Sequence, residues 1–120
     1  ANLLVIGNAE SPAFPPELIQ YVNQRVPFGR GLININFLVN YDWEWDLKSL
    51  TENGRLESFE IPKLDLIIRW GGWRRLSGFL PAQSVYADFY IVDDYWPNYN
   101  KSHILDALRW YQDCDRTLGG

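Results

Sequence analysis

The sequence of 120 residues contains no methionine, a single cysteine and a single histidine, and it lacks any long hydrophobic run. One thiol, Cys114, cannot form an internal disulfide and leaves a metal site short of thiolates, so we interpret it as a structural thiol in a reducing compartment. No apolar stretch approaches the roughly 18 residues that span a bilayer, and none near the start has the basic flank of a signal peptide. We therefore expect a cytoplasmic location, with a peripheral association with membranes left open.

Positive charge is also scarce, because 11 Lys and Arg residues face 15 Asp and Glu residues, for a net charge of −4. This balance gives no electrostatic reason to expect a nucleic-acid partner. The 47% of hydrophobic residues and 16% of aromatic residues suffice for a core and exclude global disorder. We expect residues 1–120 to form a single domain. The absent initiator leaves two possibilities, a methionine lost before Ala1 or a piece of a longer chain.

Short apolar runs alternate along the chain with segments that have helix signals. The run at residues 3–6 is continuously apolar, which is typical of a parallel strand buried on both faces. The alternation predicts an α/β fold, with a parallel sheet of about four strands and crossover helices. We expect strands at residues 3–6, 32–39, 64–69 and 89–92, and helices at residues 17–24, 45–50, 77–86 and from a cap at Ser102 onward. His103, next to that cap, is interpreted as an exposed histidine without a function.

The loop after the third expected strand carries the densest set of candidate binding residues. Parallel sheets bind ligands beyond the carboxyl ends of their strands. Arg69 ends the strand, Gly71 and Gly72 let backbone amides approach a ligand, and Arg75 and Ser77 lie at the expected helix start. Guanidinium groups bind phosphate oxygens in pairs, and a helix N-terminus adds partial positive charge. The loop therefore predicts an anion site suited to a diphosphate; the alternative, surface arginines paired with nearby acids, stays open.

Several stretches resemble the cis-prenyltransferases, which are the undecaprenyl diphosphate synthases and their relatives in the eukaryotic dolichol pathway. The family pattern D-L-[IV]-I-R-T-G-G-E-x-R-[IL]-S-N-F matches the stretch that starts at residue 65, and Q-x-x-Y-A-E-x-Y-F matches residues 83–90. The family's W-P pair stands at residues 96–97 and its closing R-x-x-G-G at residues 116–120. Upstream, residues 32–41 resemble L-x-x-N-I-A-x-N-Y-G-G-R, and residues 5–8 resemble the end of R-[IV]-I-G-D. Order and spacing agree over nearly all of the chain.

The resemblance implies an activity and a substrate site. Members condense isopentenyl diphosphate onto an allylic diphosphate with cis geometry, using Mg²⁺. By match to the motif, Arg69, Arg75 and Ser77 hold the diphosphate of isopentenyl diphosphate, or of another prenyl diphosphate. These are the residues that the charge pattern by itself selects for an anion.

Three further positions carry family roles by resemblance alone. Asp88 stands where the family has a glutamate associated with the metal, although a position before a strand lies away from the carboxyl ends of the sheet. Arg116 and Gly119 belong to the carboxy-terminal motif, which in the family reaches an active site across a dimer interface.

Departures from the family pattern concern both length and charge. The D-G-N-G-R-W run, whose aspartate binds the allylic diphosphate through Mg²⁺, has no counterpart here, so no catalytic residue is assigned and enzymatic activity is left open. Asp42, Trp43 and Glu44 replace Gly-Gly-Arg and place negative charge near an anion. Trp70 replaces a threonine and Trp73 a glutamate; they fill space or contact a prenyl chain or a partner.

We therefore expect the chain to correspond to the carboxy-terminal half of a cis-prenyltransferase. An exposed sheet edge is a liability in isolation, so we expect a homo-oligomer or a hetero-oligomer with a prenyltransferase subunit. Three functions remain open. The chain contributes an isopentenyl-diphosphate site to isoprenoid chain elongation without activity alone, it is a non-catalytic accessory subunit, or it is a diphosphate-binding regulatory module.

Overall fold

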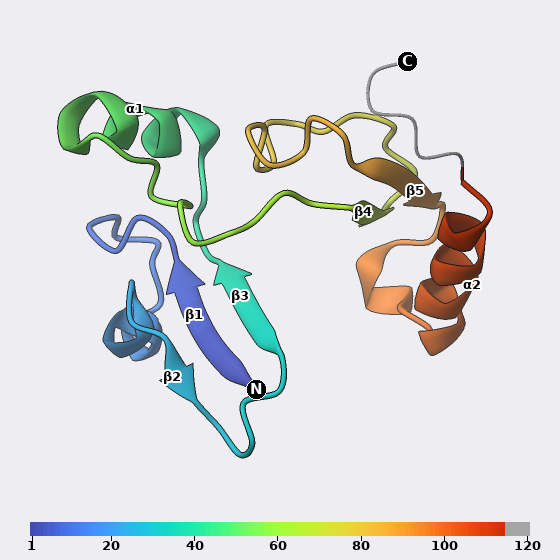
Figure 1. The fold of residues 1–120 in the computed structure, drawn as a ribbon, viewed down its shortest axis with the longest axis horizontal. Helices are drawn as coiled ribbons and strands as arrows, with labels where there is room; N and C mark the ends of the chain where they lie inside the picture. The colour runs from blue at the N-terminus through green and yellow to red at the C-terminus, as the bar shows by residue number, and fades with distance from the viewer. Residues whose placement is uncertain (115–120) are drawn as a thin grey trace. The chain divides into compact units, whose positions relative to one another are not determined.

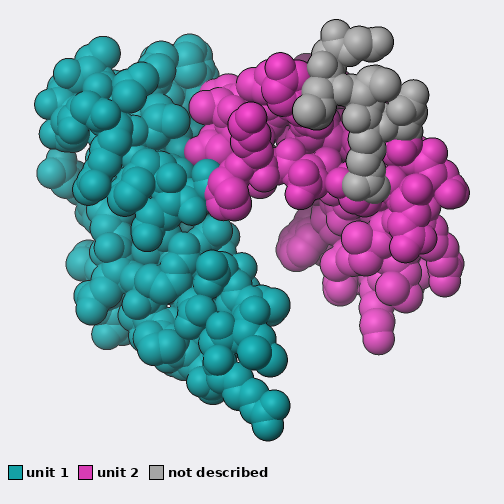
Figure 2. Space-filling model, viewed as in Figure 1, with its two compact units in different colours: residues 1–61 teal, residues 62–120 magenta. Residues whose placement is uncertain are grey.

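A computed structural model describes residues 1–114 and divides the chain into two compact units, residues 1–61 and residues 62–120 (Figures 1 and 2). Each unit holds one parallel pair of strands. The expected α/β class is thus confirmed, and the four predicted strands form as two parallel pairs that belong to separate sheets. The single-domain organisation stays a prediction. No helix among residues 1–114 has the length and apolar character needed to cross a membrane.

The sheet of the first unit is built around β1 (Asn2–Ile6), which is its central strand (Figure 1). It pairs in parallel with β3 (Asn34–Leu38) and antiparallel with the two-residue strand β2 (Val26–Pro27). The apolar run predicts burial, and its last three residues are buried, as expected for a strand with neighbours on both sides.

The helices of the first unit differ in length from their predictions. The expected helix at 17–24 is a short 3-10 helix, η1 (Pro16–Tyr21), because the chain then returns to the sheet, where the backbone N–H of Asn23 donates to the carbonyl of Val5. The expected helix at 45–50 is longer and forms α1 (Trp43–Asn53). Asp42 begins α1 as its N-cap, and Gly54 ends it in the left-handed conformation.

The second unit contains β4 (Leu66–Trp70) and β5 (Asp88–Val92), which pair in parallel. A short 3-10 helix, η2 (Trp96–Asn98), leads into α2 (Lys101–Gln112), which contacts both strands (Figure 1). The N-cap of α2 is Asn100 rather than the expected Ser102, since the Asn100 side chain accepts a hydrogen bond from the backbone of Ser102.

The expected helix at 77–86 does not form, which corrects that prediction. The connection from β4 to β5 runs through turns instead. Ser77, Gly78 and Leu80 all have positive φ angles, of 52°, 75° and 40°, and the right-handed helix excludes such values. Leu80 is nearly fully buried, so packing of its side chain against the unit favours this irregular path.

Candidate functional site

The predicted anion-binding residues meet at the carboxyl end of β4. Arg69 is the last residue but one of that strand and lies opposite Ile91 of β5. Its Nη1 donates to Oγ of Ser77 at 3.2 Å and to the backbone carbonyl of Arg75. The loop that follows β4 therefore folds back onto the Arg69 guanidinium and brings all three predicted residues together.

The Arg75 side chain takes a different direction from the one the sequence predicts. Its guanidinium carbon lies 4.4 Å from the ring centroid of Trp73, which is a cation–π contact. Neither Arg69 nor Arg75 has a carboxylate within ion-pair distance among residues 1–114. The described residues therefore do not support the alternative in which these arginines are paired surface charges.

The glycine amides are not directed at a ligand, which corrects a second prediction. The backbone N–H of Gly71 donates to the carbonyl of Asp94 at 2.9 Å, and that of Gly72 donates to the carbonyl of Val92 at 3.1 Å. Both glycines have positive φ, of 97° and 73°, a conformation in which a side chain is strained. With no helix starting at Ser77, the predicted anion site would depend on side chains rather than on backbone amides or a helix terminus.

A cavity of about 450 Å³ adjoins the Arg69 guanidinium. Arg69 and Ser77 supply its polar groups, and the rest of its wall is apolar and aromatic: Ile67, Ile68, Trp70, Leu76, Phe79, Phe89 and Trp96. Small-molecule sites typically combine such apolar walls with a few polar groups that fix the orientation of the ligand. The cavity suits a ligand with an anionic head and a hydrocarbon tail.

The structure separates Asp88 from this site. Asp88 is the first residue of β5, three residues before the partner of Arg69, and therefore about 10 Å from it along the strand. Mg²⁺ takes several oxygen ligands. No group of three or more His, Cys, Asp or Glu residues able to hold a metal ion occurs among residues 1–114. Arg116 and Gly119 lie outside the described residues.

The sequence interpretation missed the contacts of His103, which is not the exposed residue expected. Its side chain is only 16% exposed. Trp70 Nε1 donates to His103 Nδ1 at 3.0 Å, and His103 Nε2 lies 3.2 Å from Oδ2 of Asp94. One local signal was present in the sequence. His103 follows Asn100 by three residues, which is the spacing of a capping box, in which the imidazole turns back toward the backbone N–H of Asn100.

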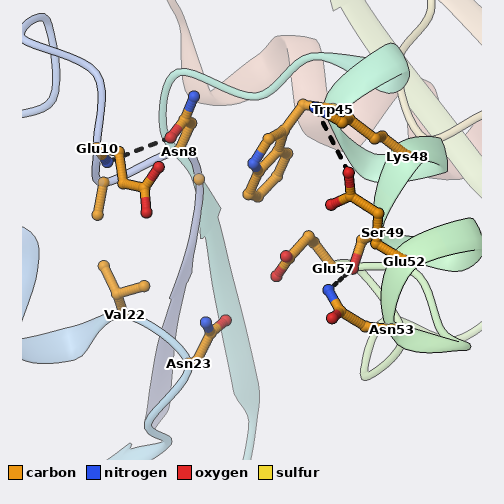
Figure 3. A pocket seen from close by; sticks show the side chains of 12 residues that line it. Asn8, Glu10, Val22, Asn23, Trp45, Lys48, Ser49, Glu52, Asn53 and Glu57 are labelled. Atoms are coloured by element: carbon orange, nitrogen blue, oxygen red, sulfur yellow. Dashed lines mark hydrogen bonds and ion pairs between the residues drawn. The ribbon is translucent and has the colours of Figure 1, made fainter.

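A second cavity, of about 430 Å³, lies in the first unit where β1 ends (Figure 3). Glu10, Glu52, Glu57 and Lys48 are its charged lining residues, and Glu52 pairs with Lys48 at 3.5 Å (Figure 3). Because its acidic side chains outnumber its one lysine, this cavity repels an anion. Its charge is therefore unsuited to a diphosphate.

Known proteins resemble this chain both in sequence and in fold. The isoprenyl transferase of Leptospira interrogans is 45% identical over 60 residues, which cover 50% of this chain and 25% of that protein. The tritrans,polycis-undecaprenyl-diphosphate synthase (geranylgeranyl-diphosphate specific) of Aeropyrum pernix is 28% identical over 129 residues, which cover 99% of this chain and 57% of that protein. This chain thus spans somewhat over half of the length of the Aeropyrum pernix relative, against which it aligns almost completely.

Among solved structures, lavandulyl diphosphate synthase from Lavandula x intermedia, in complex with dimethylallyl diphosphate, superposes with a TM-score of 0.69. The match covers 98% of this chain and 60% of that chain at 21% identity, so it shows a common fold. The family model described as "Putative undecaprenyl diphosphate synthase" matches residues 1–119. The chain therefore belongs to the undecaprenyl diphosphate synthase family of cis-prenyltransferases.

Proposed function

We propose that this chain binds isopentenyl diphosphate and contributes that binding site to isoprenoid chain elongation. The observation that carries the proposal is the Arg69–Ser77 pair at a mostly apolar cavity. A diphosphate needs positive charge and hydrogen-bond donors, whereas a five-carbon isopentenyl group gains from burial against apolar walls. The names of the related synthases support this class of ligand.

Arg69 would hold the diphosphate oxygens with its guanidinium, and the Ser77 hydroxyl would donate a further hydrogen bond. Arg75 would leave Trp73 and turn toward the same anion. This exchange is favourable, because an exposed cation–π contact is worth about 0.5–1 kcal/mol, whereas a hydrogen bond to a charged group is worth about 1.5–3 kcal/mol.

Isothermal titration of the 120-residue chain with isopentenyl diphosphate, in buffer containing a chelator, tests the proposal. Arg69→Ala should weaken binding about 10- to 100-fold, the effect of losing a charge-assisted hydrogen bond. Arg109→Ala is the matched control, since Arg109 is exposed on α2 and pairs only with Asp106 among residues 1–114. Equal affinities for the wild type and Arg69→Ala, or no binding at all, would overturn the proposal.

The second candidate, a non-catalytic accessory subunit, is favoured by a different observation. Leu32 and Ile33 are 80% and 62% exposed, which is unusual for adjacent large apolar side chains without a partner.

A prenyl-transfer assay with a complete cis-prenyltransferase, run with and without this chain, distinguishes the two candidates. Stimulation that survives Arg69→Ala indicates an accessory role, whereas stimulation lost in that variant indicates a contributed substrate site. Turnover by the 120 residues alone, with Mg²⁺ and both diphosphates, would contradict the accessory role.

A further inference from the structure

We propose that Trp70, held in place by His103, determines the preference of the cavity for the hydrocarbon part of its ligand. The inference rests on the proposed function, since it assigns a role within the same cavity. Trp70 follows the anion-binding Arg69 directly and, together with Trp96, forms part of the cavity wall.

The cavity lies beside β4. Four consecutive residues of that strand, 67 to 70, line it. A ligand in this cavity meets the Arg69 side chain beside the aromatic side chains of Trp70 and Trp96.

Hydrogen bonds hold the Trp70 indole before any ligand arrives. His103 Nδ1 accepts from Trp70 Nε1 at 3.0 Å and from the backbone N–H of Asn100 at 3.1 Å. Because Nδ1 accepts these bonds, the ring N–H is on Nε2, which faces Oδ2 of Asp94 at 3.2 Å. The imidazole is thus held on both ring nitrogens, by the N-cap of α2 and by Asp94, which lies two residues after β5.

Aromatic packing restricts the same indole further. Trp70 and Trp96 meet edge to face, with ring centroids 4.9 Å apart, and Tyr99 lies 6.0 Å from Trp70. Aromatic pairs at such distances are stabilising beyond the area that they bury. An indole that is already held in place loses little conformational entropy when a ligand binds. More of the free energy of its contact with a hydrocarbon therefore contributes to the affinity.

Trp70 also differs from the family pattern, which has threonine at this position. A threonine offers far less apolar surface than an indole and has no indole N–H to donate to His103. The preference that we infer is therefore for a diphosphate with an attached isopentenyl group over inorganic diphosphate.

The test compares titrations with isopentenyl diphosphate and with inorganic diphosphate for each variant of the 120-residue chain. Trp70→Thr should weaken binding of isopentenyl diphosphate about tenfold, or ~1.4 kcal/mol, and change binding of inorganic diphosphate by less than about twofold. Trp43→Thr, at an exposed position of α1, is the matched control and should change neither affinity. A loss of the same size for both ligands, or no loss for either, would overturn the inference.

Variants of the supporting histidine separate a role in positioning from a role in folding. His103→Ala should reduce the preference about threefold, and His103→Asn, which keeps an acceptor near the position of Nδ1, should restore it. Trp70→Phe retains an aromatic wall without the N–H group and should behave as His103→Ala does. These two variants test the inference even if Trp70→Thr does not fold. If Trp70→Phe and His103→Ala both keep the preference for isopentenyl diphosphate over inorganic diphosphate, the role of His103 is contradicted.

Failure of the inference and failure of the proposed function have different signatures. If the wild type binds neither diphosphate, or if Arg69→Ala has no effect, the proposed function is wrong. If inorganic diphosphate binds through Arg69 but the preference for isopentenyl diphosphate does not depend on Trp70, only the inference is wrong.

Discussion

Gly7, directly after β1, marks a point where two backbones approach closely. A Cβ atom at this position would overlap the carbonyl oxygen of Val39, so no side chain fits without a shift of the sheet. We predict that Gly7→Ala lowers the free energy of unfolding by about 3 kcal/mol, as measured by urea denaturation. Gly29→Ala is the control, because nothing lies within 4 Å of its added Cβ and only its positive φ is unfavourable. That variant should lose about 1 kcal/mol. Equal losses would contradict the steric explanation.

Asp46 is a buried carboxylate that joins α1 to the segment after it. It is 3% exposed and accepts hydrogen bonds from the backbone N–H of Ser58 at 2.9 Å, from Oγ of Ser58 at 2.6 Å and from the Tyr41 hydroxyl at 2.8 Å. We predict that Asp46→Ala destabilises the chain by about 3 kcal/mol, because its buried donors lose a charged acceptor. Asp106→Ala, which removes an exposed ion pair, should cost less than about 1 kcal/mol in the same thermal or urea measurement. A similar small loss for both variants would refute this role.

Some residues of the candidate site can be predicted from local sequence patterns, and others cannot. The sequence predicts Arg69, Arg75 and Ser77 because charge and a hydroxyl at a strand end are visible in the chain itself, and the structure brings them together. It does not predict the partner of Trp70, since His103 lies 33 residues away along the chain. Such a contact depends on how α2 packs against β4.

At the scale of elements, the N-terminus of α2 depends on a pair of reciprocal hydrogen bonds. The Asn100 side chain accepts from the backbone of Ser102, and the imidazole of His103 accepts from the backbone of Asn100. We predict that Asn100→Ala destabilises the chain by about 1 kcal/mol, the usual cost of losing an N-cap. Lys101→Ala, one residue further on, should change the thermal midpoint very little. A midpoint for Asn100→Ala equal to that of the wild type would show that the cap does not limit stability.

The elements that the sequence misplaces have local causes that are visible only in the backbone. A serine followed by a helix-compatible run predicts a helix from residue 77, yet the positive φ angles of Ser77 and Leu80 prevent it. The burial of Leu80 outweighs the helix propensity of this segment. Asp42, one of the residues that replace the family's Gly-Gly-Arg, has a structural role instead. It is the N-cap of α1, so its charge serves to begin a helix rather than to repel a bound anion.

At the scale of the whole molecule, many large apolar side chains remain exposed among the described residues. β3, which carries the half-exposed Phe37, is an outer strand of its sheet, and Ile33 precedes it. We predict that the 120-residue chain sediments above its monomer mass of 14.0 kDa at tens of micromolar, because association covers this surface. Ile33→Lys should shift the distribution toward the monomer, and Lys63→Ala serves as a control. A monomer at every concentration would contradict the prediction.

By itself, the sequence determined the α/β class, the four strands and the family, and it predicted three residues that meet at the carboxyl end of β4. These features depend on periodicity, on glycine and proline positions and on motif spacing, which are local properties of the chain. Only the tertiary structure decided that the amides of Gly71 and Gly72 bond to the end of β5, that Asp88 lies away from Arg69, and that Trp70 is held by His103. The physical reason is that each of these depends on which distant segments come into contact, and local patterns do not encode such contacts.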